Sequence, residues 1–510
     1  MRRKLFTLLL VLSVMFTMCS STGAAYAAET PEGTPIATLE ELKAIENDPY
    51  GKYYLTADIE IPEGFTLFKY EYPPKTAFYG TLDGNGHKLI GLTYNHNGGY
   101  IEGSALFGKC SGATFKNLTL SGVNINITSD AGMKFGVLTY WADNGCTFEN
   151  ITLEGTVNLN GSADQASYTF GGLSTYIYKD ATIKSCKNKM DINAKIVTGK
   201  NGYSGASVNI FGLSPAVYAS NTIKSCSNTG DITFEGFASS VSIAGVSNAS
   251  GTKLSSTKNS GDITVTLTDI GQKTYAVKVA GVTTDGKEGL TSCYNTGKIK
   301  VSGANGSDVR VAGVACEANT VSKCYNKGAV SLTGEAREAF VGGVVGSGSP
   351  SQTYNKGKVS ASAKASYLYV GGVAGEIYKM TYCYNTGAVS MSKAGDQGMV
   401  GGLAGNAYVT GTSAKYNYNT GKVTGETQFK GSIFGTYSGP EYDMKRTINY
   451  NYYTSSAKAY GASGVTWKDW TAKATKVSAI TSANCSKLSS KYWTYSKDKK
   501  RLILKNNKEK

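Results

Sequence analysis

Short segments in which polar and apolar residues alternate recur along most of the chain and predict short β-strands. Ala329-Val-Ser-Leu-Thr333 is one of them, with Val330 and Leu332 on one face and Ser331 and Thr333 on the other. A second kind of segment is glycine-rich, such as Val341-Gly-Gly-Val-Val-Gly346. Glycine inside a strand indicates a corner or a close approach of two backbones. The two kinds of segment alternate, which indicates a repeat.

A turn of the form Cys-Tyr-Asn-x-Gly precedes each alternating segment. Its copies begin at residues 186, 226, 257, 293, 324, 353, 383 and 417, so the steps are 40, 31, 36, 31, 29, 30 and 34 residues. A period near 30 with scattered longer steps is typical of a stacked coil with loop insertions. We therefore predict an all-β fold, a right-handed parallel β-helix, since parallel crossovers are right-handed in most cases.

The coil stacking predicts ladders of equivalent residues along the axis. Asn in an Asn-x-Gly turn bonds its own backbone and tolerates left-handed geometry, and stacked amides can pair. The cysteines fall on one ladder as small apolar residues, and we expect mostly free, buried thiols. These structural ladder positions are Cys186, Cys226, Cys293, Cys324, Cys383, Asn228, Asn259, Asn295, Asn326, Asn355, Asn385 and Asn419.

The Gly-Gly-Leu-Ala-Gly strand and the Cys-Tyr-Asn-Thr-Gly turn resemble those of the GLUG-repeat family of bacterial secreted and surface proteins. The segment from Ile36 to Ile45, a short helix with Thr38 as N-cap and Glu41 three residues later, is similar to the start of such β-helices. The resemblance implies the fold but says little about activity. Some members carry an M26-type metallopeptidase domain, whereas this chain has two histidines, His87 and His96, and no His-Glu-x-x-His motif.

The ends of the chain differ from the repeats. A basic start, an apolar run from Leu5 to Met18 and the small-x-small site Ala25-Tyr-Ala27 predict a signal peptide and a secreted or cell-surface location. We divide the chain into a signal peptide (1–27), an N-terminal cap (28–100), GLUG-like repeats (101–440) and a C-terminal cap with a solvated basic tail (441–510). No other apolar run is long enough to span a membrane.

The sequence offers little for catalysis. The candidate carboxylates include Asp231, Asp262 and Asp285, but Asp231 and Asp262 occupy equivalent positions just after the turn glycine, which favours a structural role. We expect no enzyme and no cofactor. The alternative is a polysaccharide-degrading β-helix, a glycoside hydrolase or lyase, because its carboxylates can be far apart in sequence.

Tyrosine is abundant, at 35 residues, and is common at binding surfaces. The tyrosines of the turns are expected to stack in a ladder, so the candidates for binding lie elsewhere: Tyr176, Tyr178, Tyr367, Tyr369, Trp467 and Trp470. The net charge of +15 comes mostly from lysine, which suits a soluble surface or attraction to polyanions rather than nucleic acid recognition. We predict a monomeric, non-catalytic scaffold or adhesin-like binder of an anionic cell-wall polymer, a glycan or a host protein.

Overall fold

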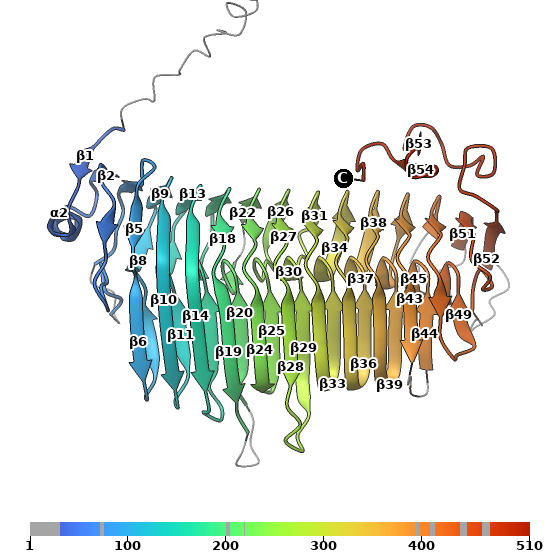
Figure 1. Cartoon of the computed structure of the whole chain (residues 1–510), viewed down its shortest axis with the longest axis horizontal. Helices are drawn as coiled ribbons and strands as arrows, with labels where there is room; N and C mark the ends of the chain where they lie inside the picture. The colour runs from blue at the N-terminus through green and yellow to red at the C-terminus, as the bar shows by residue number, and fades with distance from the viewer. Residues whose placement is uncertain are drawn as a thin grey trace, which may run out of the picture.

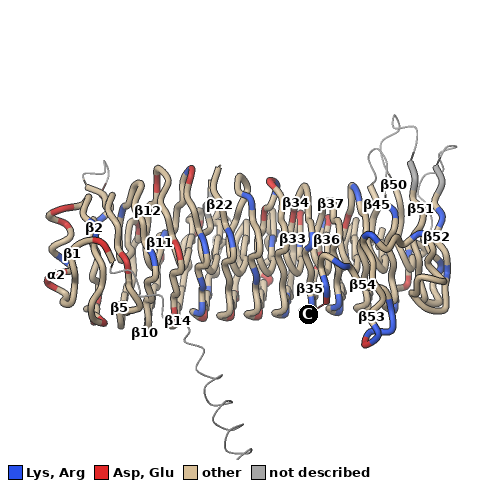
Figure 2. Tube along the Cα trace, turned by 90° about the horizontal axis from the view of Figure 1, so that it is seen from above, with Lys and Arg blue, Asp and Glu red and all other residues tan. Residues whose placement is uncertain are grey.

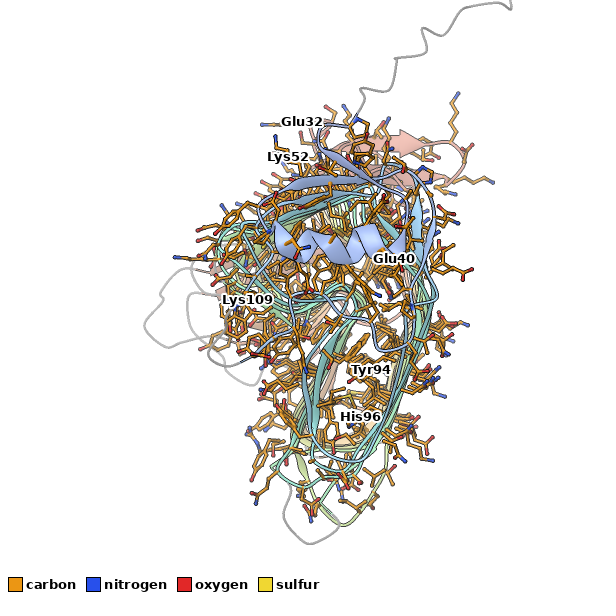
Figure 3. The ribbon with its side chains drawn as sticks, turned by 90° about the vertical axis from the view of Figure 1, so that its left-hand side faces the viewer. Glu32, Glu40, Lys52, Tyr94, His96 and Lys109 are labelled. Atoms are coloured by element: carbon orange, nitrogen blue, oxygen red, sulfur yellow. The ribbon has the colours of Figure 1, made fainter. Side chains whose placement is uncertain are left out.

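The computed structural model describes residues 31–71, 76–199, 205–218, 220–392, 395, 397–408, 414–438, 446–461 and 470–509. The chain is nearly all-β and forms a parallel β-solenoid of about 12 turns, with one short α-helix near the N-terminus (Figure 1). Along the axis, the cross-section is elongated, wide where the helix lies and narrower toward His96 (Figure 3). The signal peptide predicted at 1–27 lies outside the described residues.

Each coil begins with a long arm that runs to the narrow edge and a second arm that returns from it. The first arms are β6 (Thr93–Asn97), β10 (Thr119–Ser129), β14 (Thr152–Gly161), β19 (Asp191–Val197), β24 (Ile232–Phe237), β28 (Ile263–Leu267), β43 (Val389–Ser392) and β48 (Val423–Thr424). The return arms are β7 (Ile101–Ser104), β11 (Met133–Gly136), β15 (Ser167–Gly171), β20 (Ser207–Phe211), β25 (Ser240–Ala244), β29 (Thr274–Ala280), β44 (Gln397–Gly401) and β49 (Phe429–Gly431). Both arms are one bent strand in β33 (Ile299–Ala312), β36 (Val330–Gly342) and β39 (Val359–Gly371).

Shorter strands close the coil on its wide side. They follow the bend that contains Gly342 and Gly343 or their counterparts in other coils, here called the Gly-Gly bend. After the Gly-Gly bend come β8 (Phe107–Ser111), β12 (Thr139–Asp143), β16 (Ser174–Ile177), β21 (Ala216–Val217), β30 (Thr283–Asp285), β34 (Ala315–Ser322), β37 (Val345–Ser351), β40 (Ala374–Ile377), β45 (Ala404–Tyr408) and β50 (Phe434–Ser438). The next ladder holds β1 (Thr34–Ile36), β2 (Lys52–Leu55), β4 (Thr81–Asp83), β9 (Thr114–Lys116), β13 (Thr147–Glu149), β17 (Thr182–Lys184), β22 (Asn221–Lys224), β26 (Thr252–Ser255), β31 (Leu290–Thr291), β41 (Met380–Thr381), β46 (Ala414–Lys415), β51 (Arg446–Tyr453) and β52 (Trp470–Lys476).

The Asn-x-Gly turn supplies the last ladder, with β3 (Ile59–Glu60) and β5 (Lys88–Ile90) at its N-terminal end. It continues through β18 (Lys187–Asn188), β23 (Ser227–Asn228), β27 (Lys258–Asn259), β32 (Tyr294–Asn295), β35 (Tyr325–Asn326), β38 (Tyr354–Asn355), β42 (Tyr384–Asn385) and β47 (Tyr418–Asn419). Because β4 pairs with β9, and β47 with β51, the ladders continue through the predicted boundaries at residues 100 and 440.

Coils stack in register, so each interior side chain meets its counterpart in the next coil. Val330 pairs with Val359, Val359 with Val389, and Val389 with Val423. All four are buried, as are most residues of the same ladder. Burial of apolar surface in this continuous core is the main stabilising contribution, because one coil alone cannot enclose a core.

Two glycine ladders are required by close approach of neighbouring coils. A Cβ built on Gly328 of the turn would lie 1.8 Å from the carbonyl oxygen of Gly297 in the preceding coil. One built on Gly343 of the Gly-Gly bend would lie 2.0 Å from the carbonyl oxygen of Gly372 in the next coil. Real Cβ atoms do not approach backbone this closely, so glycine is needed for space and not for an unusual φ angle.

A chain of amide hydrogen bonds runs through the buried turn asparagines. In each asparagine before Asn419, Nδ2 donates to Oδ1 of the next asparagine and to the carbonyl two residues on, which belongs to Met190 for Asn188 and to a glycine for the others; for Asn326 the distances are 2.8 Å to Asn355 and 2.7 Å to Gly328. The chain links Asn188, Asn228, Asn259, Asn295, Asn326, Asn355, Asn385 and Asn419. Both amide protons are therefore used in a fully buried position, which removes the cost of burying a polar group.

The helix α2 (Leu39–Ala44) covers the first coil. Thr38 accepts from the backbone N–H of Glu41, and the Glu41 carboxylate accepts from the N–H of Thr38, which is the expected capping box. The helix is shorter than the predicted 36–45 segment, because Ile36 is in β1 and a 3-10 turn (Ile45–Asn47) follows. Leu42 and Ile45 are buried and close the end of the core.

The C-terminal residues 477–509, here called the strap, fold back over the turn tyrosines (Figure 1). Tyr294, Tyr325, Tyr354, Tyr384 and Tyr418 form the predicted ladder, with successive ring centroids 4.6–5.0 Å apart. The antiparallel pair β53 (Trp493–Ser496) and β54 (Arg501–Leu504) packs Trp493, Leu502 and Leu504 on it. The sequence predicted that the tail from Lys497 is solvated. This is wrong for its apolar residues, because they cover the tyrosine ladder.

Polar contacts fix the strap along several coils. Tyr418 donates to the carbonyl of Leu502 at 2.5 Å, and Asn507 Nδ2 donates to the carbonyls of Cys324 at 3.1 Å and Gln352 at 2.9 Å. The Glu509 carboxylate is 1% exposed; it accepts from Tyr384 at 2.7 Å and forms ion pairs with Lys356 and Arg501. Burial alone would raise the pKa of Glu509, but these partners outweigh it and hold the pKa below its usual value.

The nine cysteines of the described residues are all free and buried, as the ladder predicted. Cys186, Cys226, Cys293, Cys324 and Cys383 are at most 1% exposed, and burial raises the pKa of Cys186 and Cys324 well above the usual value. A buried thiol with a raised pKa is a poor nucleophile, so these residues act as small apolar side chains.

Removing one amide from the buried chain should destabilise the solenoid. Asn326→Ala deprives Asn295, Asn355 and Gly328 of a partner, and we expect a loss of about 1–3 kcal/mol in the free energy of unfolding. Denaturant unfolding followed by circular dichroism measures it. Asn193→Ala is the matched control, because Asn193 makes the same type of bond, to Asn158, at an exposed position. We expect its effect to stay within about 0.5 kcal/mol; equal losses in both variants would contradict the role of burial.

The strap should detach at low pH. A carboxyl with a pKa lowered by folding stabilises the folded form above its unfolded pKa of 4.5 and loses this contribution as the pH falls through the folded value. We therefore expect Trp493, buried under the strap, to become exposed to a fluorescence quencher below pH 4.5. In Glu509→Gln this pH dependence should disappear; an unchanged acid transition in that variant would show that other carboxyls control docking.

Candidate binding site

The Gly-Gly bend brings the outward side chains of two strands toward each other. On the return arm these are Thr169 and Asn209, which pair between β15 and β20, and after the bend they include Tyr176 and Tyr218. These residues line one cavity of about 280 Å³, together with Ser167, Pro215, Asn248 and Ser250. The bend therefore forms a recess on the outside of the solenoid, in the looser N-terminal half of the repeat.

Six aromatic side chains gather beside this recess, and we call them the aromatic face: Tyr70, Tyr140, Trp141, Tyr176, Tyr178 and Tyr218. Trp141 stacks on Tyr178 at 4.4 Å between ring centroids, and Tyr178 stacks on Tyr218 at 5.0 Å. Tyr70 stacks on the other side of Trp141 at 5.7 Å. The four stacked rings follow the solenoid axis over neighbouring coils.

The aromatic face remains accessible while its rings are held in place. Tyr218 is 45% exposed, Tyr70, Trp141, Tyr176 and Tyr178 are half-buried, and Tyr140 is buried. Burial raises the pKa of Tyr178 to about 12, with smaller contributions from Tyr218 and Tyr176. Its phenol therefore stays neutral at ordinary pH and can both donate and accept a hydrogen bond.

An ion pair supports the base of the aromatic face. Lys134 Nζ lies 2.9 Å from Glu102 Oε1, and the Tyr140 hydroxyl donates to the same oxygen at 2.7 Å. Burial raises the pKa of Glu102, but Tyr140 and Lys134 outweigh it and lower the pKa overall. Burial and the hydrogen bond to Glu102 raise the pKa of Tyr140. The network fixes the Tyr140 ring, against which Tyr176 packs edge-on at 5.6 Å.

The recess adds hydrogen-bonding groups next to the rings. Ser167 and Thr169 hydroxyls lie 3.0 Å apart, and Asn209 comes from the next coil. Asn248 Oδ1 is buried and has no hydrogen-bond partner among the residues that the structure describes. A buried acceptor without a partner is costly unless a ligand or water supplies a donor. The recess thus combines amides and hydroxyls with aromatic surface.

The structure separates the binding candidates predicted from the sequence. Tyr176 and Tyr178 lie together in the aromatic face, 6.3 Å apart. Tyr367 and Tyr369 share a face of β39, but only Tyr367 is accessible, at 39% exposed; Tyr369 is packed with Phe340 and Met399. Trp467 lies outside the described residues, and the side chain of Trp470, the first residue of β52, does as well.

Sequence reasoning missed Trp141 and Tyr218. Trp141 pairs with Tyr176 between β12 and β16, so aligning the coils on the Gly-Gly bend would have placed it beside the predicted tyrosines. Leu173, which follows Gly172, and Leu213 occupy the same position in their bends. When the two coils are aligned on these leucines, Tyr178 and Tyr218 also fall at the same position. The signal was therefore present but required an alignment of the irregular N-terminal coils.

The predicted acidic candidates have mainly structural contacts. Asp231 accepts from the backbone N–H of Asp262 at 2.8 Å, and Asp262 accepts from that of Lys298 at 2.7 Å, as expected for equivalent ladder positions. Asp285 accepts from the backbone of Lys287 and pairs with its ammonium group at 3.2 Å. None of the three lies in the recess.

A second acidic pair, not predicted, lies farther along the Gly-Gly bend. Glu317 pairs with Ser347, and Ser347 with Glu376, so the two carboxyls occupy one ladder with a single coil between them. Lys278 lies 2.6 Å and Arg310 3.4 Å from Glu317. Burial raises the pKa of Glu317, but both cations outweigh it and lower the pKa overall. Glu376 accepts from Asn406 at 2.8 Å, and burial raises its pKa.

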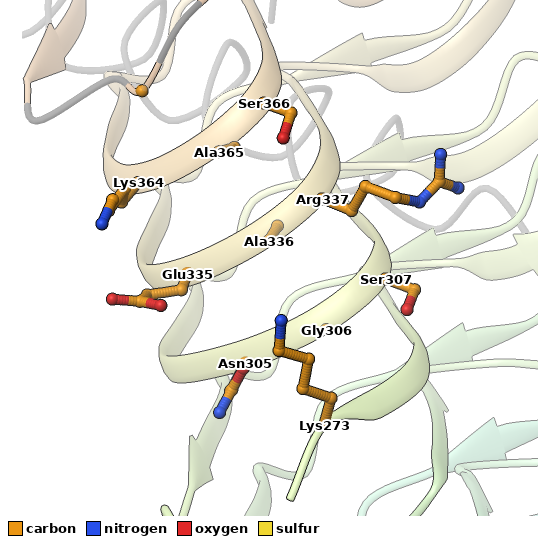
Figure 4. Close-up of a pocket in the computed structure, with 11 residues that line it drawn as sticks. Lys273, Asn305, Gly306, Ser307, Glu335, Ala336, Arg337, Lys364, Ala365 and Ser366 are labelled. Atoms are coloured by element: carbon orange, nitrogen blue, oxygen red, sulfur yellow. The ribbon is translucent and has the colours of Figure 1, made fainter.

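A hollow of about 310 Å³ lies at the narrow edge, where the two arms of β33, β36 and β39 meet (Figure 4). Its floor is made of small residues such as Gly306, Ala336 and Ala365, and Lys364 and Glu335 point outward from its rim. It offers no aromatic ring and no buried polar group. We regard it as a bend in the sheet.

The described residues contain no group of three or more His, Cys, Asp or Glu placed to hold a metal ion. Within the same residues, no helix is long and apolar enough to cross a membrane.

Comparison with known proteins adds one partial similarity. No family model matches the chain, and no solved structure matches it. A stretch of 156 residues is 31% identical to Halomucin from Haloquadratum walsbyi, covering 27% of this chain and 2% of that protein. The matched stretch is thus about a quarter of the chain and a small fraction of this relative, and the resemblance to GLUG repeats stays a prediction.

Proposed function

We propose that the protein is an exported, non-catalytic β-solenoid that binds a glycan on its aromatic face and serves as a cell-surface or extracellular scaffold. The observation that carries this proposal is the axial stack of Tyr70, Trp141, Tyr178 and Tyr218 beside a recess of amides and hydroxyls. Sugar rings present apolar C–H groups that pack on the accessible edges of these stacked rings, and their hydroxyls pair with amides and hydroxyls.

The fold favours binding of an extended chain. The rings are supplied by successive coils, so they repeat along the axis, as the units of a polymer do. They are attached to a rigid sheet and supported by the Lys134–Glu102–Tyr140 network. Preorganised side chains lose less conformational entropy on binding, which raises affinity. The predicted signal peptide and the GLUG-like repeat agree with an exported protein, and both remain part of the proposal.

Truncating the aromatic face should weaken glycan binding. A glycan array with neutral and acidic polysaccharides identifies the ligand, and calorimetry then measures its affinity for wild type, Trp141→Ala and Tyr178→Ala. We expect each variant to lose roughly tenfold or more, because buried aromatic anchors dominate binding energy. Tyr275→Ala is the matched control, since Tyr275 is 72% exposed and lies outside the aromatic face. Equal affinities for all four proteins would refute the site.

A second candidate function is hydrolysis of a polysaccharide by Glu317 and Glu376. Two strand spacings of about 4.8 Å, or about 9.6 Å in all, separate their backbones. This is near the upper end of the roughly 6.5–9.5 Å found between the carboxyls of inverting glycosidases. The environments push the two pKa values apart, as a general acid and a general base require. In this scheme Glu317 takes a proton from water, the water oxygen bonds to the anomeric carbon, and Glu376 protonates the departing oxygen.

The two candidates are distinguished by the products. For hydrolysis, the wild type releases new reducing ends from the bound polysaccharide, at a rate that falls as the pH rises past the raised pKa of Glu376. Glu376→Gln should then bind with unchanged affinity and release none. Tight binding by the wild type without any new reducing ends would exclude the hydrolase and leave the scaffold.

A further inference from the structure

Tyrosine occupies a strained backbone position in three successive C-terminal coils. Every coil from Asn117 onward turns into the Asn-x-Gly ladder through one residue with positive φ, and in the earlier coils this is Asn, Ser, Lys or Gln. In the last three it is Tyr382, Tyr416 and Tyr450, with φ of 56°, 65° and 55°. The left-handed region is unfavourable for a bulky side chain, and such outliers concentrate at functional sites.

These tyrosines form an accessible row. Ring centroids of Tyr382 and Tyr416 are 5.3 Å apart, as are those of Tyr416 and Tyr450, and the strap adds Tyr492 at 3.9 Å from Tyr382. Tyr450 is 39% exposed and the others are half-buried. The row lies on a different ladder from the covered tyrosines that begin at Tyr294.

Lysines accompany the row from end to end. Lys415 lies over the Tyr416 ring at 5.6 Å, Lys487 over Tyr450 at 5.9 Å and Lys491 over Tyr492 at 5.4 Å. We call these three lysines and the four tyrosines the basic edge. Each group at its surface, phenol or ammonium, can donate a hydrogen bond, and none carries a negative charge.

The strap extends this positive surface (Figure 2). Its 33 residues hold seven lysines and one arginine against Asp498 and Glu509, and Glu509 is buried in ion pairs. The seven lysines are all exposed, and none pairs with an acid within the described residues: Lys487, Lys491, Lys497, Lys499, Lys500, Lys505 and Lys508. Unpaired charge of one sign on a fixed element attracts a polymer of the opposite sign.

We propose that the basic edge and the strap form a second binding site, for an anionic glycopolymer whose carboxylate or phosphate groups contact the lysines and tyrosine hydroxyls. The stacked rings cover one another's faces at 5.3 Å, so they leave no gap in which a nucleic acid base could stack. Lysine supplies point charges rather than the bidentate fork of arginine, which suits repeated anionic groups on a flexible chain.

The test uses the full-length protein and four immobilised probes: polygalacturonate, poly(glycerol phosphate), neutral dextran and a single-stranded oligodeoxynucleotide. We expect the two anionic glycopolymers to bind and dextran not to bind at this site. Raising the salt from about 50 to about 300 mM should weaken binding on the order of tenfold or more. Preference for polygalacturonate or for poly(glycerol phosphate) tells whether carboxylate or phosphate is recognised.

Two sets of variants locate the site. Lys487→Gln combined with Lys491→Gln should reduce binding on the order of tenfold, whereas Lys224→Gln combined with Lys253→Gln, at exposed positions elsewhere, should not. Tyr416→Asn and Tyr450→Asn place at the corner the residue found at Asn117 and Asn150. Both variants should keep or raise the Tm, because asparagine adopts a positive φ with less strain than tyrosine. Both should nevertheless lose affinity for the anionic glycopolymers.

Three results with the probes and the lysine variants would overturn the proposal. These are no binding of either anionic glycopolymer, equal losses in the two lysine pairs, or an oligodeoxynucleotide that binds as tightly as the glycopolymers. Trp141→Ala serves as a reference for the aromatic face, which uses different residues. A loss of glycopolymer binding only in that variant would assign the ligand to the first site and refute the second.

Discussion

Every part of the solenoid depends on keeping neighbouring coils at strand spacing all the way around the coil. At the two tightest corners the backbones come so close that the Cβ of any other residue would overlap a carbonyl oxygen, as at Gly328 and Gly343. Beside these corners the buried asparagines exchange hydrogen bonds from coil to coil, which is possible only when successive turns are in register. The apolar core and the outer surfaces follow from this stacking, because it fixes where each residue of a repeat points.

The same stacking turns a single outward position into a line of side chains along the axis. Three such lines of aromatic rings among the described residues have different environments. The turn tyrosines are covered by the strap, the aromatic face remains open beside hydroxyls and amides, and the basic edge is surrounded by lysines. An identical backbone thus provides a packing surface, a surface suited to sugar rings and a surface suited to anions.

Much of the fold could be predicted from the sequence, because the residues that stacking demands recur at a nearly fixed period. Asn326 and Gly328 identify the turn, and the Thr38 capping box identified the helix. The extent of the ladders could not be predicted, since the coils before Cys186 and after Asn419 lack the full turn motif. The strap could not be predicted either, because its apolar residues are few and their partner, the tyrosine ladder, is distant in sequence.

Of the candidate site, the sequence identified Tyr176 and Tyr178, which stand out as an alternating tyrosine pair. It did not identify Trp141 or Tyr218, whose proximity depends on the register of irregular coils. Glu317 and Glu376 occupy the same place in their repeats, but their opposite pKa shifts arise from Lys278, Arg310 and burial, which only the folded arrangement reveals.

The strap also bears on the order in which the protein assembles. Contacts between coils join residues about 30–40 positions apart, so each coil can form soon after the one before it, whereas Asn507 reaches back 183 residues to Cys324 and Glu509 reaches back 125 to Tyr384. Its contacts span coils from Cys324 to Tyr452, and a coil missing from that series would leave some of them unmade. We therefore expect the strap to dock after the coils that it spans have formed, and to dock fully only on a chain whose C-terminal coils are all in place.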